Sequence, residues 1–229
     1  MTKLPALANW EQTSHGLHAA AQLIGAIREL VCEREANYLE LAMRIEPNGL
    51  STDRLPGGGV ALLDFERAAI VFMPKDGEAA TNALAGQSQA SLLEALLGAM
   101  DARGEQLVSR SSEQTSLTQA FPAALDAREH VYKPKPEDLT NDAPLAVDPQ
   151  VSADYARALY SVFTATARFR ARLTGPQTPI VVWPEHFDLS TLWFPANDRS
   201  DEAPVMNFGF APFDGTTPLR LPVLIDKKP

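Results

Sequence analysis

The 229-residue chain contains a single cysteine, Cys32, so no disulfide bond can form within it. Long apolar runs are also lacking, because no stretch approaches the roughly 18 apolar residues that a membrane-spanning helix needs. The first ten residues carry one charge, at Lys3, and no signal-peptide pattern. Together these absences predict a protein of the reducing cytoplasm that has no membrane partner.

Positive charge is scarce. The chain has 20 Lys and Arg residues against 29 Asp and Glu residues, which gives a net charge of −9. Nucleic-acid binding needs a basic surface that displaces counterions from phosphates, so we predict no nucleic-acid partner. The local basic excess at Arg168, Arg170 and Arg172 does not change this, because alternate residues of a helix point in different directions and do not form one patch.

The motifs of several enzyme classes are missing. There is no G-x-S-x-G nucleophile turn and no G-x-G-x-x-G dinucleotide fingerprint. The glycine run Gly57–Gly59 lacks the Lys-Ser/Thr pair of a phosphate loop and precedes a strand, so we interpret it as part of a hairpin. Cys32 has acidic neighbours, which disfavour a reactive thiolate. The sequence therefore identifies no cofactor, and no metal site is assigned.

The elements that are present indicate an ordinary globular protein, with 45% hydrophobic and 21% charged residues. Apolar residues at helical spacing predict three helices, and shorter apolar runs between turn residues predict strands. We predict a single α+β domain over residues 1–229, in which an antiparallel sheet packs against about three helices. An irregular wrapping segment is expected at about 111–150. The predicted helices are 16–34, 88–102 and 152–173, and the predicted strands are 38–45, 60–65, 69–73, 106–108, 179–184, 190–194, 205–210 and 219–225.

The segment from Trp183 to Leu189 is the richest in chemistry, because it places His186 between the carboxylates of Glu185 and Asp188 directly after an apolar strand. Such a group could act in general acid–base catalysis or supply metal ligands. It could equally be a structural hydrogen-bond network at the end of a strand. The candidate catalytic residues are His186, Asp188 and His18.

The first predicted helix adds polar residues. His15, His18 and Gln22 lie on one face of it, and His18 would meet His186 only if this helix lies beside the end of the strand that carries His186. Arg28 lies at the edge of the apolar stripe, where a charge needs a partner. We therefore predict that Arg28 contacts a carboxylate, with Asp188 as first choice and Glu185 as second.

Taken as a set, these segments resemble a family of uncharacterised bacterial proteins, a domain of unknown function. The start of the chain is similar to its T-x4-H-x3-Q-x2-G-K-x-R pattern, with Ala26 in place of the lysine. The stretch from Phe169 to Asp188 is similar to its F-R-x-R…W-x-x-F-D-L signature. The resemblance implies no activity. It implies a set of site residues: His18, Gln22, Arg28, Arg170, His186 and Asp188, to which the signature adds Trp183.

Two functions remain open at this stage. An acidic chain without a nucleophile or cofactor motif, but with an aromatic-rich second half, favours a module that binds a small molecule or a protein. The alternative is a hydrolase-like enzyme that uses the His/Asp cluster, with or without the assistance of a metal. The sequence does not indicate the oligomeric state.

Overall fold

The computed structural model of the chain describes residues 10–103, 117–118, 121, 139, 141–214 and 217–218. The predicted strands at 106–108 and 219–225, and most of the predicted wrapping segment, lie outside these residues. Within them, no helix has the length and apolar character to cross a membrane.

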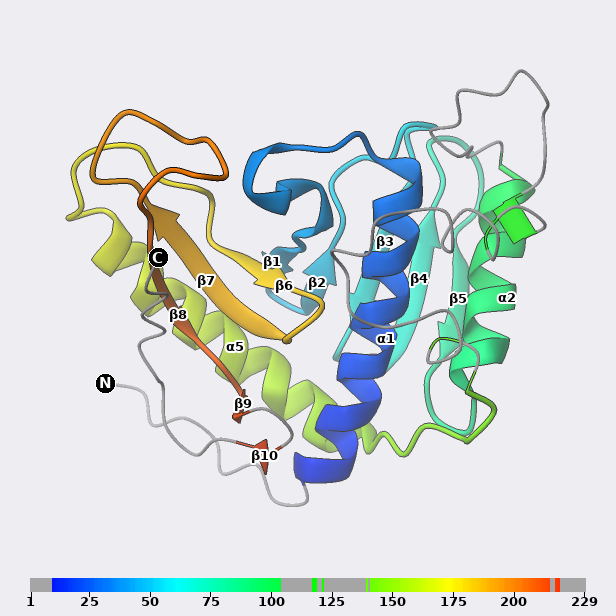
Figure 1. The fold of residues 1–229 in the computed structure, drawn as a ribbon. Helices are drawn as coiled ribbons and strands as arrows, with labels where there is room; N and C mark the ends of the chain where they lie inside the picture. The colour runs from blue at the N-terminus through cyan, green and yellow to red at the C-terminus, as the bar shows by residue number, and fades with distance from the viewer. Residues whose placement is uncertain are drawn as a thin grey trace.

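An antiparallel sheet of eight strands, β1–β8, organises the fold (Figure 1). The first five strands form a meander, and β6, β7 and β8 form a second group. The groups join where Met43 exchanges two backbone hydrogen bonds of 2.9 Å with Val182. A separate pair, β9 (Phe213–Asp214) and β10 (Thr217–Pro218), follows. The strands are β1 (Arg44–Glu46), β2 (Gly49–Ser51), β3 (Val60–Asp64), β4 (Ala69–Met73), β5 (Ala80–Ala83), β6 (Val181–Trp183), β7 (Asp188–Trp193) and β8 (Met206–Phe210).

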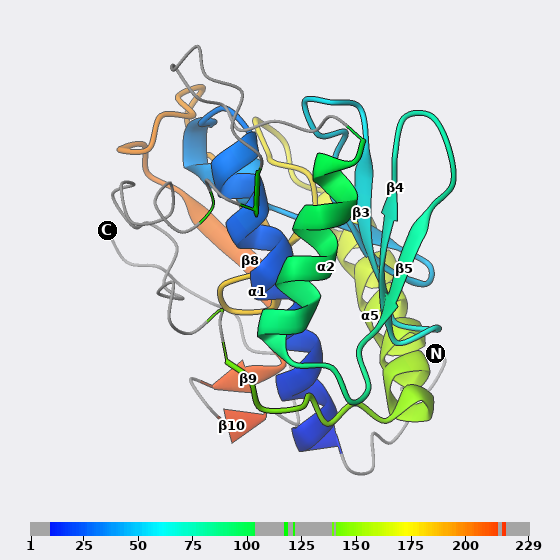
Figure 2. The ribbon, with the colours of Figure 1, turned by 90° about the vertical axis from the view of Figure 1, so that its right-hand side faces the viewer.

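Three α-helices of the described chain pack against this sheet. α1 (Trp10–Val31) and α2 (Gln89–Asp101) cover one face of the β1–β5 group, and α5 (Pro149–Arg170) crosses behind β7 and β8 (Figures 1 and 2). α2 begins at a capping box that Ser88 and Ser91 form. The predicted α+β class, with an antiparallel sheet and about three helices, is confirmed.

Two tight turns of the sheet have the same construction. Four residues join β3 to β4 and four join β6 to β7, and the last residue of each turn has a left-handed backbone, at Ala68 (φ 47°) and Phe187 (φ 56°). Both turns reach the start of α5. The carbonyl oxygen of Phe65 accepts a hydrogen bond from Ser152, and Phe187 packs on the ring of Tyr155. The two halves of the sheet therefore present equivalent turns to one helix.

The helix ends differ from those predicted. α1 begins at Trp10 rather than near residue 16, and Thr13 lies inside it, where its hydroxyl accepts from the backbone N–H of Asp148. α5 begins at Pro149 rather than near residue 152, because Asp148 is the residue whose side chain caps it. A proline in the first turn is compatible with this start, since its missing N–H has no helical partner there.

The strand predicted at 38–45 is wrong. Residues Ala36–Leu41 form a short 3₁₀ segment, η1, in which Asn37 and Tyr38 have left-handed backbones (φ 56° and 57°). The alternating apolar and charged residues therefore form a 3₁₀ segment here rather than a strand. Of the predicted range, only its last three residues enter the sheet: Met43 through its bridge to Val182, and Arg44 and Ile45 in β1.

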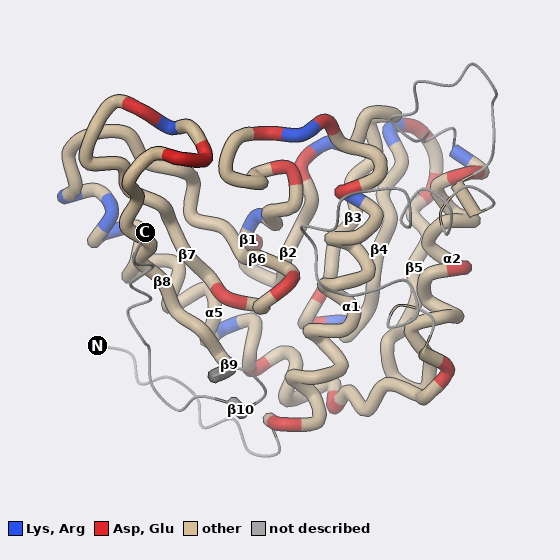
Figure 3. Tube along the Cα trace, viewed as in Figure 1, with Lys and Arg blue, Asp and Glu red and all other residues tan. Residues whose placement is uncertain are grey.

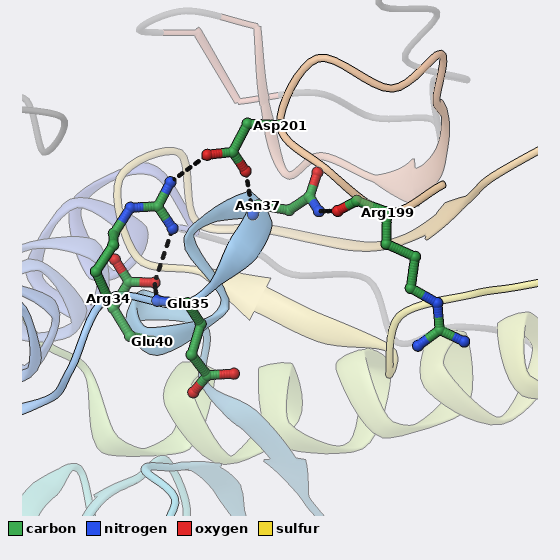
Figure 4. A network of polar contacts seen from close by, with 6 residues as sticks. All are labelled: Arg34, Glu35, Asn37, Glu40, Arg199 and Asp201. Atoms are coloured by element: carbon green, nitrogen blue, oxygen red, sulfur yellow. Dashed lines mark hydrogen bonds and ion pairs between the residues drawn. The ribbon is translucent and has the colours of Figure 1, made fainter. Parts of the chain in front are cut away.

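Polar contacts fix η1 to the loop between β7 and β8 (Figure 4). The guanidinium of Arg34 donates to the buried carboxylate of Glu40 (3.4 Å) and to Asp201 (2.7 Å), and it lies 3.6 Å from the centre of the Tyr38 ring. Asp201 also accepts from the backbone N–H of Asn37, whose side-chain amide donates to the carbonyl oxygen of Arg199. These contacts hold the left-handed backbone in place.

Candidate functional site

The first helix lies beside the strand end that carries His186, which is the condition that the sequence analysis set for a meeting of His18 with His186. On α1, the Nε2 atom of His18 lies 2.9 Å from the carbonyl oxygen of Glu185, in the β6–β7 turn. A carbonyl oxygen can only accept, so Nε2 is the protonated nitrogen and Nδ1 carries the lone pair of the neutral ring. The contact joins residues 167 positions apart in the chain.

His18 is held as a neutral, oriented imidazole. Burial lowers its pKa, the carbonyl oxygens of Glu185 and Pro184 oppose that shift, and His186 and His15 lower the pKa further by charge repulsion. Its ring stacks on Phe187 with centroids 5.6 Å apart. Two other histidines therefore lie within electrostatic range of His18: His15, one turn earlier on α1, and His186, in the β6–β7 turn.

An aromatic layer lies beneath this turn. Tyr155 of α5 is fully buried, and its ring contacts Trp10 (4.4 Å), Phe65 (5.3 Å) and Phe187 (5.6 Å). Its hydroxyl has no hydrogen-bond partner among the residues that the structure describes. Burial, and secondarily the negative charge of Asp188, raise the pKa of Tyr155, so the hydroxyl stays protonated and is a donor.

His186 itself faces solvent. Its side chain is 60% exposed, and its Nε2 atom lies 3.6 Å from the Glu185 carboxylate, beyond hydrogen-bond reach. Asp188, in contrast, is buried at the first position of β7. Within the described ranges, no three His, Cys, Asp or Glu side chains are placed to hold a metal ion.

The predicted ion pair of Arg28 is wrong. The side chain is buried, as predicted, but its Nη1 donates to the carbonyl oxygen of Ala42, and among the described residues no ion pair joins Arg28 to Asp188 or to Glu185. Arg28 lies ten residues beyond His18, about 15 Å along α1, so it does not belong to the cluster at the β6–β7 turn. A main-chain oxygen takes the place of the expected carboxylate.

Three other predicted residues have different surroundings. Gln22 lies one turn beyond His18 on the half-exposed side of α1. Arg170 donates through Nε to the carbonyl oxygen of Thr178 (2.9 Å), while Arg168 and Arg172 are exposed near the end of α5 (Figure 3). Trp183 donates through its indole N–H to the hydroxyl of Ser190 (2.7 Å).

Sequence reasoning missed three buried polar side chains: Tyr155 beneath the turn, Ser190 on β7 and Asn207 on β8. Each lies in an apolar stretch of a predicted helix or strand, where Ser and Asn carry no motif and Tyr is expected in the core. A signal was available for Asn207, because an amide in an aromatic strand needs partners when it is buried.

No curated protein and no solved structure gives a significant match to this chain. A family model does match, and it spans residues 2–210, which include every element of the eight-stranded sheet and all of the predicted site residues. The chain belongs to DUF5996, a family of unknown function.

Proposed function

We propose that this chain is a small-molecule-binding domain whose ligand contacts the junction of α1 with the β6–β7 turn. The observation that carries the proposal is the contact of His18 with the backbone of Glu185 in that turn, beside His186 of the same turn. A neutral imidazole carries one donor nitrogen and one acceptor nitrogen. The buried hydroxyl of Tyr155 supplies a further donor close by.

The same geometry favours binding over hydrolysis. Nε2 of His18 is committed to a main-chain oxygen, and the Glu185 carboxylate is too far from His186 to orient it as a general base. A metal-assisted mechanism would need a ligand set that the described residues do not supply.

NMR titration of the histidine rings tests this proposal. We would add benzamide, benzoate, benzylamine and phenyl phosphate, one at a time, to the full chain at pH 7.5 and follow the His18 and His186 ring signals. At least one probe is expected to shift both rings in a saturable manner, and to raise the melting temperature by mass action. Four probes without a saturable shift would refute the binding site.

The equivalent β3–β4 turn offers a matched control. Arg67 occupies the place in that turn that His186 occupies in the β6–β7 turn, and both side chains are exposed. His186→Ala is expected to lower the affinity for the bound probe, while Arg67→Ala is expected to leave that affinity unchanged. Equal affinities of the two variants would show that the histidine cluster does not form the site.

We also propose that the protein works in the bacterial cytoplasm, as its single cysteine suggests. Cell fractionation with an antibody against the native protein checks this location. Recovery in a periplasmic extract would contradict it.

A further inference from the structure

The eight-stranded sheet ends at β8, beside β7 (Figure 1). Among the described residues, β8 pairs with β7 alone, so its outer side can offer backbone N–H and C=O groups to a further strand. No charged residue occurs at positions 204–213, which include the whole of β8. Natural sheets protect their apolar edges with charged side chains or with a covering segment. Because β8 lacks the charges, a covering segment is expected.

One face beside this edge is apolar and open. The ring of Phe208 on β8 meets the ring of Phe169 on α5, with centroids 5.2 Å apart. Met206 points to the same side as Phe208, because side chains two positions apart in a strand share a face. Met206 is 45% exposed and Phe169 is 43% exposed, the highest values among the large apolar side chains of the described chain. A strand added to β8 would therefore bury apolar surface on α5 as well.

The hairpin of β9 and β10 directs the chain back toward this edge. Two residues separate β8 from β9, and the antiparallel register of the hairpin pairs Pro218 of β10 with Phe213 of β9. A strand that continued β10 would thus run antiparallel to β8. The same one-to-one count brings residues 221–225 opposite residues 206–210. The sequence predicts a strand at 219–225, and this count aligns it with β8.

The apolar residues of this predicted strand agree with the register. They alternate at Leu221, Val223 and Ile225. In the count Val223 falls opposite Phe208, and residues that pair across two strands share a face. Leu221 and Ile225 lie on the same side of the strand as Val223, since each is two positions away. The apolar side of the segment would therefore meet the open face that contains Phe169.

The prolines agree with the register as well. Proline has no N–H, so a ladder tolerates it only where the N–H would point away from the partner strand. Pro218 pairs with Phe213, so its nitrogen points outward from the hairpin. Backbone groups alternate in direction along a strand, and Pro222, four positions later, therefore also points outward. The N–H of Val223 then points at β8, and that of Phe208 points back.

We infer that residues 221–225 form a further antiparallel strand on β8 and cover the open face of Phe169 and Met206. The segment begins three residues after β10, so its effective concentration at this edge is high. A second copy of the chain is a poorer occupant, because both copies carry a net charge of −9 and repel each other. The inference uses none of the residues of the proposed ligand site.

Hydrogen exchange of single backbone amides, measured by NMR on the full chain, tests this strand. The amides of Phe208 and Phe210 are expected to be protected, because they donate to the added strand. Val223→Pro removes an N–H that points at β8, and it is expected to speed both exchange rates about tenfold or more. Leu224→Pro is the matched control, since the N–H that it removes points outward. The Asn207 amide points at β7 and should stay protected in both variants.

Three results would each overturn the inference. The first is equal exchange of the Phe208 amide in the wild type and in Val223→Pro, which would show that the segment does not pair with β8. The second is an equal effect of Val223→Pro and Leu224→Pro, which would contradict the register. The third is protection of the Phe208 amide that disappears when the wild type is diluted, because the edge would then belong to a second copy.

Discussion

At the scale of single residues, the close approach of neighbouring strands determines which substitutions the sheet tolerates. Gly49 of β2 pairs with Asp64, and a Cβ atom at this position would overlap the carbonyl oxygen of Leu63. The obstacle is backbone in the centre of the sheet, so it cannot move aside as a flexible side chain would. Glycine is therefore required at this position by space rather than by backbone angle.

Gly49→Ala is expected to lower the free energy of unfolding by roughly 2–3 kcal/mol, because the strands must separate locally. Gly98 is the control: it lies on the exposed side of α2 with no atom near its Cβ position. Gly98→Ala is expected to raise stability by roughly 0.5–1 kcal/mol through helix propensity. Urea denaturation of both variants measures the two effects. If Gly49→Ala lost no more stability than an ordinary surface substitution does, glycine would not be required at this position.

Single residues also differ in how well the sequence predicts their part in the candidate site. The segment around His186 is identifiable because its polar residues follow an apolar strand without interruption. The contact of His18 with Glu185 was predictable only as a condition, since nothing in the spacing of two residues 167 positions apart shows that they meet. Ser190 and Asn207 become visible only through the strand register, which places their side chains on one face.

At the scale of secondary-structure elements, local patterns succeeded where one signal dominated. The apolar run Ala69–Met73, bounded by turn residues, is a strand with the predicted ends. The buried face of α2 is also as predicted, because a capping box and helical spacing agree there. In η1, distant contacts decide the conformation: Arg34, Glu40 and the β7–β8 loop stabilise a backbone that alternation alone would make extended.

The contacts of η1 with the β7–β8 loop make a testable unit. Asp201→Ala removes the acceptor of the Asn37 backbone N–H and the exposed ion pair with Arg34. The Asn37 amide is expected to exchange with solvent faster, while global stability falls by less than about 1 kcal/mol, because exposed ion pairs contribute little.

Hydrogen exchange measured by NMR reports this local opening. Asp198 lies in the same exposed loop, and its carboxylate accepts from the backbone N–H of Ser200 rather than from η1. Asp198→Ala is therefore expected to leave the protection of Asn37 unchanged. Equal protection of Asn37 in the wild type and in Asp201→Ala would show that the loop does not hold η1.

At the scale of the whole molecule, the two halves of the sheet meet at one aromatic centre. The β3–β4 and β6–β7 turns bring Phe65 and Phe187 within 6.2 Å of each other, and Tyr155 of α5 contacts both. His18 links α1 to the same centre through Phe187 and Glu185. Protonation of this one ring therefore affects contacts among both halves of the sheet and two helices.

This arrangement predicts how stability depends on pH. Burial lowers the pKa of His18 below its ordinary value of 6.5, so the unfolded chain binds a proton more readily than the folded chain. Stability is therefore expected to be constant above pH 6.5 and to fall as the pH decreases from 6.5 toward the lowered pKa, by at most about 1.4 kcal/mol per pH unit for this proton. His15 and His186, which repel the protonated ring, act in the same direction on His18.

His18→Gln isolates this proton, because a glutamine amide can still donate to the carbonyl oxygen of Glu185 but does not titrate. Urea denaturation at pH 7.5, 6.5 and 5.5 is expected to show a steeper loss of stability in the wild type than in the variant, with the difference confined to pH values below 6.5. The carboxylates and the other histidines are common to both chains, so their contributions cancel in the comparison. Parallel stability profiles would mean that His18 titrates in the folded protein as it does in the unfolded chain, and that the junction accommodates an imidazolium without cost.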